Sequence, residues 1–352
     1  MALEIVHELD AVRDEWRRLG EDSGNLFATW EWAEAWWRHF GDGTPLLALS
    51  RDASGEPAAL VALEIRRRGP LQVARFVGHG PADELGPIAK AEDPRGADAL
   101  VELQEGGHWD VLLAERLPSA SGVAARIGGR TLLTEASPLV EVSEGAFEGY
   151  LKERSRNFRS QIRRKERSLL EKGLTYRLSD DADRLEADMS ILTALHETRW
   201  GAEGSGALGE RRAAFHLDFA RAALARGWLR LWLAELNGKP VAAWYGFRFA
   251  GKEWYYQSSR DPEWDRESVG LVLLAHTIRS AFDDGLTTYK LLRGGDAYKD
   301  RFATSDPGLE TVVAGRGPVG KAAELVSGMA LKVRRRLRGS GAGPSTTPRP
   351  SE

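Results

Sequence analysis

The sequence predicts an α/β fold built from two similar units, each a mixed and largely antiparallel sheet flanked by helices. The chain has 352 residues, which exceeds the usual size of one hydrophobic core. Its hydrophobic fraction of 42% is enough to fill two cores. A strand-turn-strand pattern also occurs once in each half of the chain, which indicates an internal repeat.

The repeated pattern is a pair of strand candidates joined by a turn that contains Gly-x-Pro. The first copy runs through Leu46–Ser50, the turn Gly55-Glu56-Pro57 and Ala58–Leu63, and the second through Leu231–Leu236, the turn Gly238-Lys239-Pro240 and Val241–Tyr245. A further strand candidate follows each copy, at Leu71–Gly78 and at Glu253–Ser259. Short connections rich in Gly and Pro form hairpins, so both sheets are expected to be largely antiparallel.

The remaining elements are predicted from periodicity and capping. Asn25–Phe40 holds four tryptophans and fits a helix whose aromatic side packs inward. In the second half, Ser268–Ile278 fits a helix with Asp265 or Ser268 as N-cap and Gly285 as its stop, and Thr287–Leu292 fits a strand. The matching region of the first half, Asp93–Leu113, gives a strand candidate only at Trp109–Leu113.

Composition excludes several classes of function. The chain has no cysteine, which excludes disulfides, zinc-thiolate sites and a thiol nucleophile, and its seven scattered histidines predict no metal site. Its 49 Lys and Arg against 52 Asp and Glu do not suggest a protein that wraps nucleic acid. The N-terminus does not have the pattern of a signal peptide, and no apolar run is long enough to span a bilayer. We expect a cytoplasmic protein.

A basic helix is predicted to join the two halves at residues 147–172. Between Lys152 and Lys172 it holds nine Lys or Arg against three Glu. An apolar stripe comprises Leu151, Phe158, Ile162 and Leu169, and a basic face a quarter-turn away comprises Lys152, Arg156, Arg159, Arg163 and Arg167. This face could bind a polyanion, a phosphorylated carrier, a nucleotide-linked sugar or an acidic lipid surface, or it could be solvated.

The C-terminal segment 319–338 fits a basic amphipathic helix. Its stripe comprises Ala322, Val326, Met329, Val333 and Leu337, and the run Lys332–Arg338 is basic. Peripheral contact with the inner face of the membrane and a capping role are the two interpretations. We expect residues 339–352, rich in Gly, Ser, Thr and Pro, to be disordered. The predicted domains are therefore 1–146 and 147–318, followed by the helix 319–338 and the tail.

Several ordered motifs between Tyr150 and Ala303 resemble one known family. They comprise Tyr150-Leu151, Asn157-Phe158-Arg159, Arg163-Arg164, His196-Glu197-Thr198-Arg199-Trp200, Tyr255-Tyr256-Gln257-Ser258-Ser259, Asp261-Pro262, Ser268-Val269-Gly270 and Arg293-Gly294-Gly295-Asp296-Ala297-Tyr298-Lys299. The segment is similar to the acetyltransferase domain of cellulose-biosynthesis (CelD-like) proteins, which is part of the GNAT superfamily and related to the FemAB peptidoglycan aminoacyltransferases. The resemblance implies two tandem GNAT-like domains, with the active site in the second.

The resemblance also implies transfer of an acyl group to an amine, with acetyl-CoA or another acyl-CoA as donor and no metal. The donor would lie along a splayed strand, with its pyrophosphate at the start of the next helix, where free N–H groups and Gly270 favour an anion. Its candidate residues are Gln257, Ser258, Ser259, Ser268, Val269 and Gly270. The chain lacks the Arg/Gln-x-x-Gly-x-Gly/Ala loop usual in GNAT enzymes.

The candidate catalytic residues are Lys299, Asp296 and Tyr256. Lys299 could stabilise an anionic group or form a surface ion pair. Asp296 could orient Lys299, accept a proton or belong to the turn after Gly295. Because neighbouring strand residues point to opposite faces, we expect only one of Tyr255 and Tyr256 to face the cleft.

The candidate residues for binding the acceptor lie on two predicted helices. Arg159 and Arg163 belong to the basic face, and His196, Arg199 and Trp200 share one side of the second helix. His196 could instead satisfy a packing hydrogen bond.

We therefore expect an N-acyltransferase that uses acyl-CoA and acts on an amine of a cell-envelope or polysaccharide precursor. A Fem-like aminoacyltransferase that uses aminoacyl-tRNA is an alternative, and it is the one interpretation in which nucleic acid is a partner. A non-catalytic accessory protein of exopolysaccharide assembly is another, because one fold serves many functions.

Overall fold

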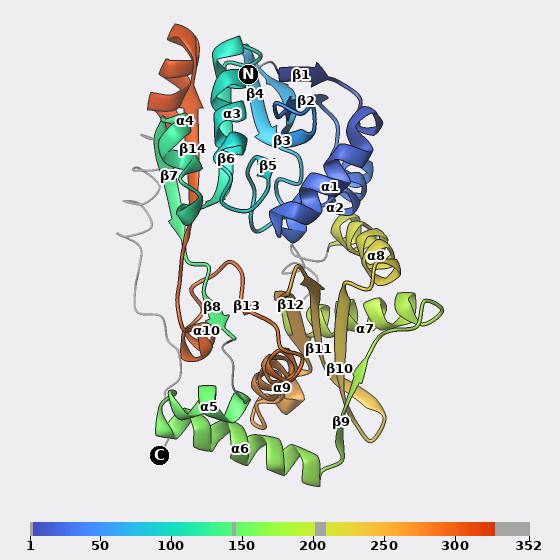
Figure 1. Cartoon of the computed structure of the whole chain (residues 1–352). Coiled ribbons are helices and arrows are strands. Elements are labelled where there is room, and N and C mark those ends of the chain that lie inside the picture. Colours follow the sequence, from blue (N-terminus) through green and yellow to red (C-terminus); the bar gives the residue numbers. More distant parts are fainter. Residues whose placement is uncertain (1–2, 143–145, 201–208, 328–352) are drawn as a thin grey trace.

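The protein folds into two sheets with helices packed around them (Figure 1). The computed structural model describes residues 3–142, 146–200 and 209–327, without the side chains of Arg199 and Trp200. The fold class expected from the sequence, two mixed sheets flanked by helices, is confirmed.

The first sheet has the order β1-β2-β3-β4-β6-β14-β7, with the short β5 paired to β3. Its strands are β1 (Leu3–Val6), β2 (Thr44–Arg51), β3 (Pro57–Arg68), β4 (Leu71–Phe76), β5 (Ile88–Ala89), β6 (Val111–Pro118), β7 (Arg130–Glu135) and β14 (Leu309–Gly315). Its helices are α1 (Arg13–Ser23), α2 (Trp30–Phe40), α3 (Arg95–Gly106) and α4 (Val123–Ile127). One neighbouring pair, β4 with β6, is parallel, and the pairs around it are antiparallel.

The second sheet has the order β8-β13-β12-β11-β10-β9. Its strands are β8 (Leu139–Glu141), β9 (Leu174–Leu178), β10 (Leu229–Leu236), β11 (Lys239–Phe249), β12 (Lys252–Arg260) and β13 (Thr288–Lys290). Its helices are α5 (Phe147–Lys152), α6 (Arg156–Glu171), α7 (Leu185–Trp200), α8 (Glu210–Ala225), α9 (Val269–Asp283) and α10 (Ala297–Phe302). Here too one pair, β12 with β13, is parallel.

The repeat extends further than the sequence indicated. In each unit a meander of hairpins leads to a helix and then to a strand that pairs in parallel with the last strand of the meander. The helix of the first unit is α3, which lies in the region 93–113, where the sequence pattern predicted only a strand at Trp109–Leu113. Its small residues, including Ala97 and Ala99, pack directly on the sheet.

The predicted helix at residues 147–172 is wrong in one respect, because it consists of two helices. α5 ends at Lys152, and the side chain of Ser155 accepts a hydrogen bond from the Phe158 N–H at 3.3 Å to cap α6. Phe158, Ile162 and Leu169 are buried, as expected for the apolar stripe. At about 100° per residue, Arg156, Arg163 and Arg167 lie nearly opposite this stripe rather than a quarter-turn from it.

The two sheets exchange strands across the expected border at residue 146. β8 lies before that border but pairs with β13 of the second sheet. β14 lies far after it but sits between β6 and β7 of the first sheet, as Figure 1 shows. The first sheet is therefore completed by the C-terminal part of the chain.

Two hydrophobic clusters fill the interior. The Trp-rich segment is helical at Trp30–Phe40, and Trp30, Trp32 and Trp36 are buried as predicted. Trp32 contacts Phe215 and Phe219 of α8 edge-on at 5.0 and 4.7 Å between ring centroids. The first cluster therefore continues from the first domain into one face of the second sheet, and the second cluster lies on the other face, under α9 and α6.

The C-terminal segment is helical at residues 317–327, and Ala322 and Val326 of its predicted apolar stripe are exposed. Met329, Val333, Leu337, the basic run and the tail 339–352 lie outside the described residues. Within the described part of the chain, no helix is long and apolar enough to cross a membrane.

Candidate active site

The second sheet opens at the point where β12 and β13 stop pairing. Their parallel register ends at Trp254 and Lys290, whereas β12 continues to Arg260. Beyond Trp254, no strand among the described residues pairs with the edge of β12 that faced β13. A cavity of about 200 Å³ lies there, lined by Gly80, Pro81, Asp83, Arg212, Tyr255, Tyr256, Gln257, Arg293, Asp296, Tyr298 and Lys299.

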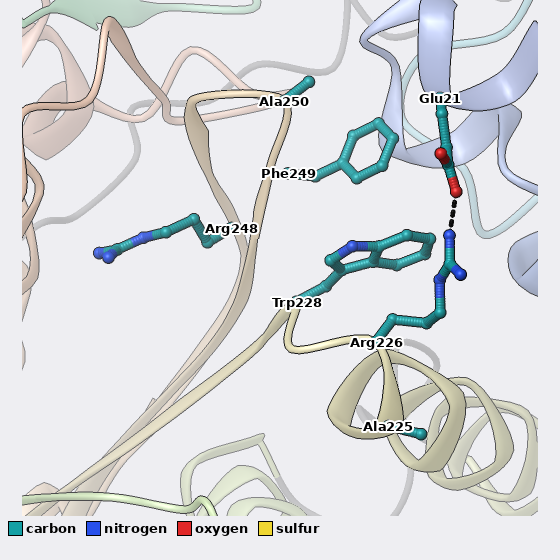
Figure 2. Close-up of a pocket in the computed structure, with 7 residues that line it drawn as sticks. All are labelled: Glu21, Ala225, Arg226, Trp228, Arg248, Phe249 and Ala250. Atoms are coloured by element: carbon teal, nitrogen blue, oxygen red, sulfur yellow. Dashed lines mark hydrogen bonds and ion pairs between the residues drawn. The ribbon is translucent and has the colours of Figure 1, made fainter.

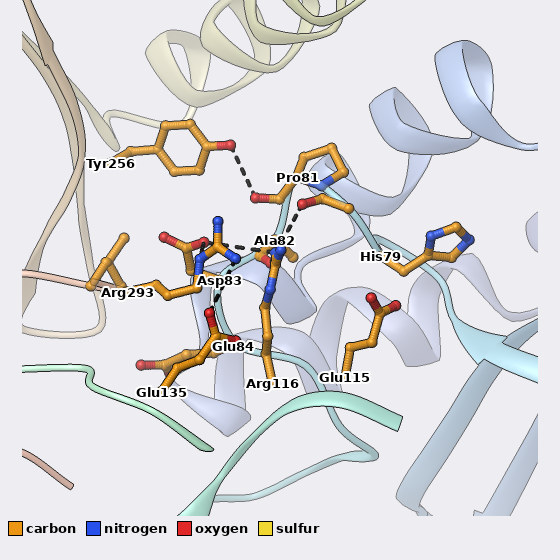
Figure 3. Close-up of polar contacts among 12 residues, drawn as sticks. His79, Pro81, Ala82, Asp83, Glu84, Glu115, Arg116, Glu135, Tyr256 and Arg293 are labelled. Carbon is orange, nitrogen blue, oxygen red and sulfur yellow. Dashed lines mark hydrogen bonds and ion pairs between the residues drawn. The ribbon is translucent and has the colours of Figure 1, made fainter. Parts of the chain in front are cut away.

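One wall of this cavity comes from the loop after β4 in the first domain (Figure 3). The Tyr256 hydroxyl donates a hydrogen bond to the Pro81 carbonyl at 3.0 Å. Arg116 donates to the Gly80 carbonyl at 2.8 Å and also to the Ala82 carbonyl. The backbone φ of Gly80 is 92°, a value that side chains with a Cβ rarely adopt. The cavity is therefore closed by both domains.

A buried ion cluster fixes the start of the same loop. His79 contacts the Glu64 carboxylate at 3.0 Å, and the His79 carbonyl accepts a hydrogen bond from Trp36 at 2.9 Å. Burial would raise the pKa of Glu64, but hydrogen bonds from His79, Arg66 and two backbone N–H groups lower it to about 2. The carboxylate is therefore charged at neutral pH and holds His79, four residues before Asp83.

Asp83 brings a carboxyl group to the cavity. Its side chain is 14% exposed and lies 3.8 Å from Arg116 Nη1 and 3.5 Å from Arg293 Nε. Burial raises the pKa of Asp83, and the opposing effect of Arg293, Arg116 and Lys299 does not cancel the rise. A carboxylate with a raised pKa next to a cavity is suited to accept a proton from a substrate.

Lys299 is buried at the other side of the cavity. It is 6% exposed, and its ammonium donates to the Arg293 carbonyl at 2.7 Å and to the Leu292 carbonyl at 3.4 Å. Burial lowers the pKa of Lys299. An ammonium has three donors, so one N–H is not used by these two carbonyls.

Asp296 stands at the N-cap position of α10 and is close to Lys299. Its Oδ2 lies 4.0 Å from Lys299 Nζ, and its side chain is 60% exposed. Gly294 has a φ of 117°, so this stretch is a turn that requires glycine. Asp296 therefore follows a turn and lies beside Lys299, and its role in the reaction stays a prediction.

Tyr255 and Tyr256 both line the cavity, and the expectation that only one would do so is wrong. Their rings do pack on opposite faces of the sheet, since Tyr255 belongs to the second hydrophobic cluster and Tyr256 packs against the first. Both nevertheless reach the cavity because it lies at the free edge of β12. Burial raises the pKa of Tyr256, so its phenol stays protonated and donates to Pro81.

His196 lies behind the cavity wall. It is 3% exposed, and its Nδ1 is 3.2 Å from the side-chain nitrogen of Gln257, which lines the cavity. His196 therefore contacts a cavity residue and is not itself a lining residue. Arg199 and Trp200 end α7, and their side chains lie outside the described part of the structure.

The other predicted donor-site residues surround the start of α9. Ser268 has a φ of 59° and precedes a first turn that no side chain caps. A Cβ at Gly270 would lie 3.1 Å from the side chain of Arg260. Ser258 contacts the Tyr255 hydroxyl, whereas Ser259 and Val269 are buried. Of this set, Gln257 lines the cavity, whereas Ser268 and Gly270 are partly exposed and do not line it.

Arg159 and Arg163 are not brought to the cavity. Arg159 donates to the carbonyls of Lys152 and Arg154, and Arg163 pairs with Glu148. Both line a separate hollow on α6.

Three charged residues of the cavity were not among the sequence candidates: Asp83, Arg212 and Arg293. Arg293 opens the quoted motif that ends at Lys299, and it could have been found there. Asp83 follows the Gly78-His79-Gly80-Pro81 run, whose glycines and proline indicate a special loop. Its contribution to a site in the other domain depends on domain packing, which local patterns do not encode.

A second hollow between the domains, of about 520 Å³, is an open surface (Figure 2). Arg226 crosses it to pair with Glu21 of α1, beside the rings of Trp228 and Phe249. Arg248 pairs with Glu253 and Asp284. Because both guanidinium groups already pair with carboxylates of the protein, this hollow has fewer unpaired charges to bind a ligand than the cavity at β12. No group of three or more potential metal ligands occurs among the described residues.

The sequence of the second domain matches a known family. Residues 156–300 match the model of the acetyltransferase (GNAT) domain family. The match covers α6 to α10 and so includes the splayed β12 and most of the cavity. No curated protein matches the chain.

Solved structures resemble the whole chain. FemX superposes with a TM-score of 0.60 at 12% identity, covering 89% of this chain and 95% of that one. A second is the C-terminal domain of a putative lysylphosphatidylglycerol synthetase from Agrobacterium fabrum, with a TM-score of 0.57, 13% identity and coverage of 94% and 97%. A third structure, L-PGS from Bacillus licheniformis, superposes with a TM-score of 0.51 at 10% identity, covering 86% of this chain and 96% of that one. These likenesses show the fold over nearly the whole chain, and the GNAT family match lies in the second domain.

Proposed function

We propose that this protein is an N-acyltransferase that moves an acyl group from acyl-CoA to an amine in the cavity between its domains. The observation that carries this proposal is the splay of β12 from β13, which opens onto two acidic and three basic side chains. The GNAT match at residues 156–300 supports acyl transfer as the reaction class.

Asp83 has the position and the pKa direction of a general base. The amine nitrogen attacks the thioester carbonyl, the C–N bond forms, and the C–S bond breaks to release CoA as its thiolate. The amine proton passes to Asp83. Lys299 supplies a positive charge to the oxyanion that forms on the carbonyl, which is the charge development that enzymes stabilise most.

The residues at the start of α9 fit the anionic part of an acyl-CoA. The first turn has no side-chain cap, so its N–H groups are available to a pyrophosphate. Arg260, which pairs with Asp265, lies beside Gly270. Val269 and Ser259 are buried and would support this site without touching the donor.

The acceptor is proposed to be an amine that also carries an anionic group, as many cell-envelope and polysaccharide precursors do. Arg212 lines the cavity and has no hydrogen-bond or ion-pair partner for its guanidinium among the described residues. A carboxylate or phosphate of the acceptor would satisfy it. The assignment to the CelD-like type remains a proposal from the motifs.

A second candidate is aminoacyl transfer, as in FemAB-related proteins. The observation that favours it is the fold shared with FemX and with a putative lysylphosphatidylglycerol synthetase over nearly the whole chain. The usual GNAT phosphate loop is also missing from the sequence. The same cavity would then bind an aminoacyl ester.

Thermal unfolding with acetyl-CoA and longer acyl-CoAs distinguishes the two candidates. A donor at 100 times its Kd adds about 2.7 kcal/mol to the free energy of unfolding. We expect stabilisation that Gly270→Trp abolishes and that Lys299→Ala leaves largely intact. No response to any acyl-CoA, with the variants folded, would favour an aminoacyl donor or an accessory protein.

Turnover is measured as release of the CoA thiol with a thiol reagent while amines are screened as acceptors. Because the chain has no cysteine, the protein gives no background signal. Release that depends on an amine supports transfer. Donor binding with no amine-dependent release in the presence of envelope and polysaccharide precursors would contradict the proposed acceptors.

A further inference from the structure

Helix α6 carries five arginines on a face that takes no part in the core. Arg156, Arg159, Arg163, Arg164 and Arg167, together with Ser160, line a hollow of about 400 Å³. The opposite side of the helix buries Phe158, Ile162 and Leu169. The arginines therefore contribute nothing to the hydrophobic packing of this helix.

Most of this positive charge is not neutralised within the protein. Arg163 pairs with Glu148, and Arg159 donates to two carbonyl groups. Arg156, Arg164 and Arg167 are exposed and have no hydrogen-bond or ion-pair partner among the described residues. Like charges three and four residues apart on a helix repel each other and lower its stability. An anion bound to this face would relieve that repulsion.

The position of α6 suits contact with an extended surface. It lies at the end of the molecule remote from the first domain, as Figure 1 shows. Arg156 and Arg167 are eleven residues apart, which spaces the row over about 16 Å of helix. The whole chain has a net charge of -3, so a negatively charged surface attracts this face and repels the rest.

We propose that the arginine face of α6 docks the protein on a membrane surface rich in anionic phospholipids. Guanidinium groups bind lipid phosphates through paired hydrogen bonds. The hollow has no aromatic lining residue on which a nucleic-acid base could stack. It also has no apolar lining residue that could enter the bilayer, so the contact is electrostatic and salt-sensitive. This proposal is independent of the proposed reaction.

The test is co-sedimentation of the full-length protein with vesicles. One set contains phosphatidylcholine alone, and the other contains phosphatidylcholine mixed with phosphatidylglycerol. The variant Arg156→Gln/Arg164→Gln/Arg167→Gln removes three exposed charges without breaking a contact. The control Arg67→Gln/Arg68→Gln/Lys90→Gln removes three exposed charges from the first domain and gives the same net charge.

We expect the wild type and the control to bind the anionic vesicles at low salt and to dissociate at high salt. The α6 variant should bind them on the order of 100-fold more weakly, from the affinity that each basic residue adds near such a surface. Equal losses in both variants, or no binding by the wild type at low salt, would overturn the proposal. The proposal would also be overturned if the protein did not bind the vesicles but bound duplex RNA through the arginines of α6.

Discussion

Asp83 occupies an uncommon environment for a carboxyl group, since it is largely buried yet lies near two arginines. Burial raises the pKa of Asp83, which suits a general base, and the positive charges of Arg293 and Arg116 oppose this rise. The more exposed Asp296, at the opposite wall, lacks that burial.

We predict that Asp83→Asn lowers kcat for amine acylation by about 10²–10⁴-fold. In the wild type, kcat should rise with pH as Asp83 loses its proton, and the variant should lose this dependence. The measurement is the pH profile of CoA release, with Asp296→Asn as the matched control. A larger loss of kcat in the control would assign the base to Asp296 instead.

His216 is a second residue whose environment has a measurable effect. It is fully buried among aromatic rings, and neither ring nitrogen has a hydrogen-bond partner in the described structure. Burial lowers the pKa of His216 from 6.5 to about 3. The folded state therefore keeps this imidazole neutral, whereas the unfolded state takes up a proton below pH 6.5.

We predict that His216 makes the protein acid-sensitive. Its contribution to stability is fully present above pH 6.5 and is lost as the pH falls toward 3. Between about pH 7.5 and about pH 5 the loss is about 2 kcal/mol. His216→Phe should remove this part of the pH dependence in urea unfolding. An unchanged pH dependence would show that His216 is already protonated or accessible in the folded state.

At the scale of elements, a single cap decides where α6 begins. Ser155 accepts the Phe158 N–H, and its placement lets the chain turn between α5 and α6. The turn allows Phe147 and Tyr150 on α5 and Phe158 on α6 to pack into the same cluster.

We predict that Ser155→Ala lowers the free energy of unfolding by about 1 kcal/mol, because an N–H at the start of α6 loses its partner. The control is Ser160→Ala on the exposed face of the same helix, which should leave stability unchanged or raise it slightly. Urea unfolding of both variants is the measurement. Equal effects would show that the cap does not hold the start of α6.

At the scale of the molecule, the two domains depend on each other. β14 fills the gap between β6 and β7, and β8 extends the second sheet. The Lys290 ammonium also donates to the Glu84 carboxylate at 2.6 and 2.7 Å, next to the loop that carries Asp83. The cavity thus exists only when the domains are assembled.

We predict that a fragment of residues 1–146 does not fold by itself, because its sheet lacks β14. A fragment of residues 1–136 joined by a flexible linker to residues 307–327 should fold, since it restores the strand between β6 and β7. Circular dichroism and urea unfolding report the outcome. Cooperative unfolding of the 1–146 fragment would show that β14 is dispensable.

The sequence by itself determined the repeat, most strands and the helix at 268–278, because Gly-x-Pro turns, alternation and caps are local signals. It also located Lys299, Asp296, Tyr256 and Gln257 within one motif-bearing region, and the structure brings all four to one cavity. Arg159 and Arg163 were grouped with them from the motifs and from the basic face of their helix, and the fold places them on another surface.

The tertiary structure alone decided which domain closes the cavity and where the chain exchanges strands. Asp83 reaches the site because the loop after β4 is held by Glu64, Arg116 and Tyr256, which lie far apart in the sequence. The pairing of β14 with β6 likewise joins residues about 200 positions apart. Such contacts are fixed by the packing of completed units, and no local periodicity records them.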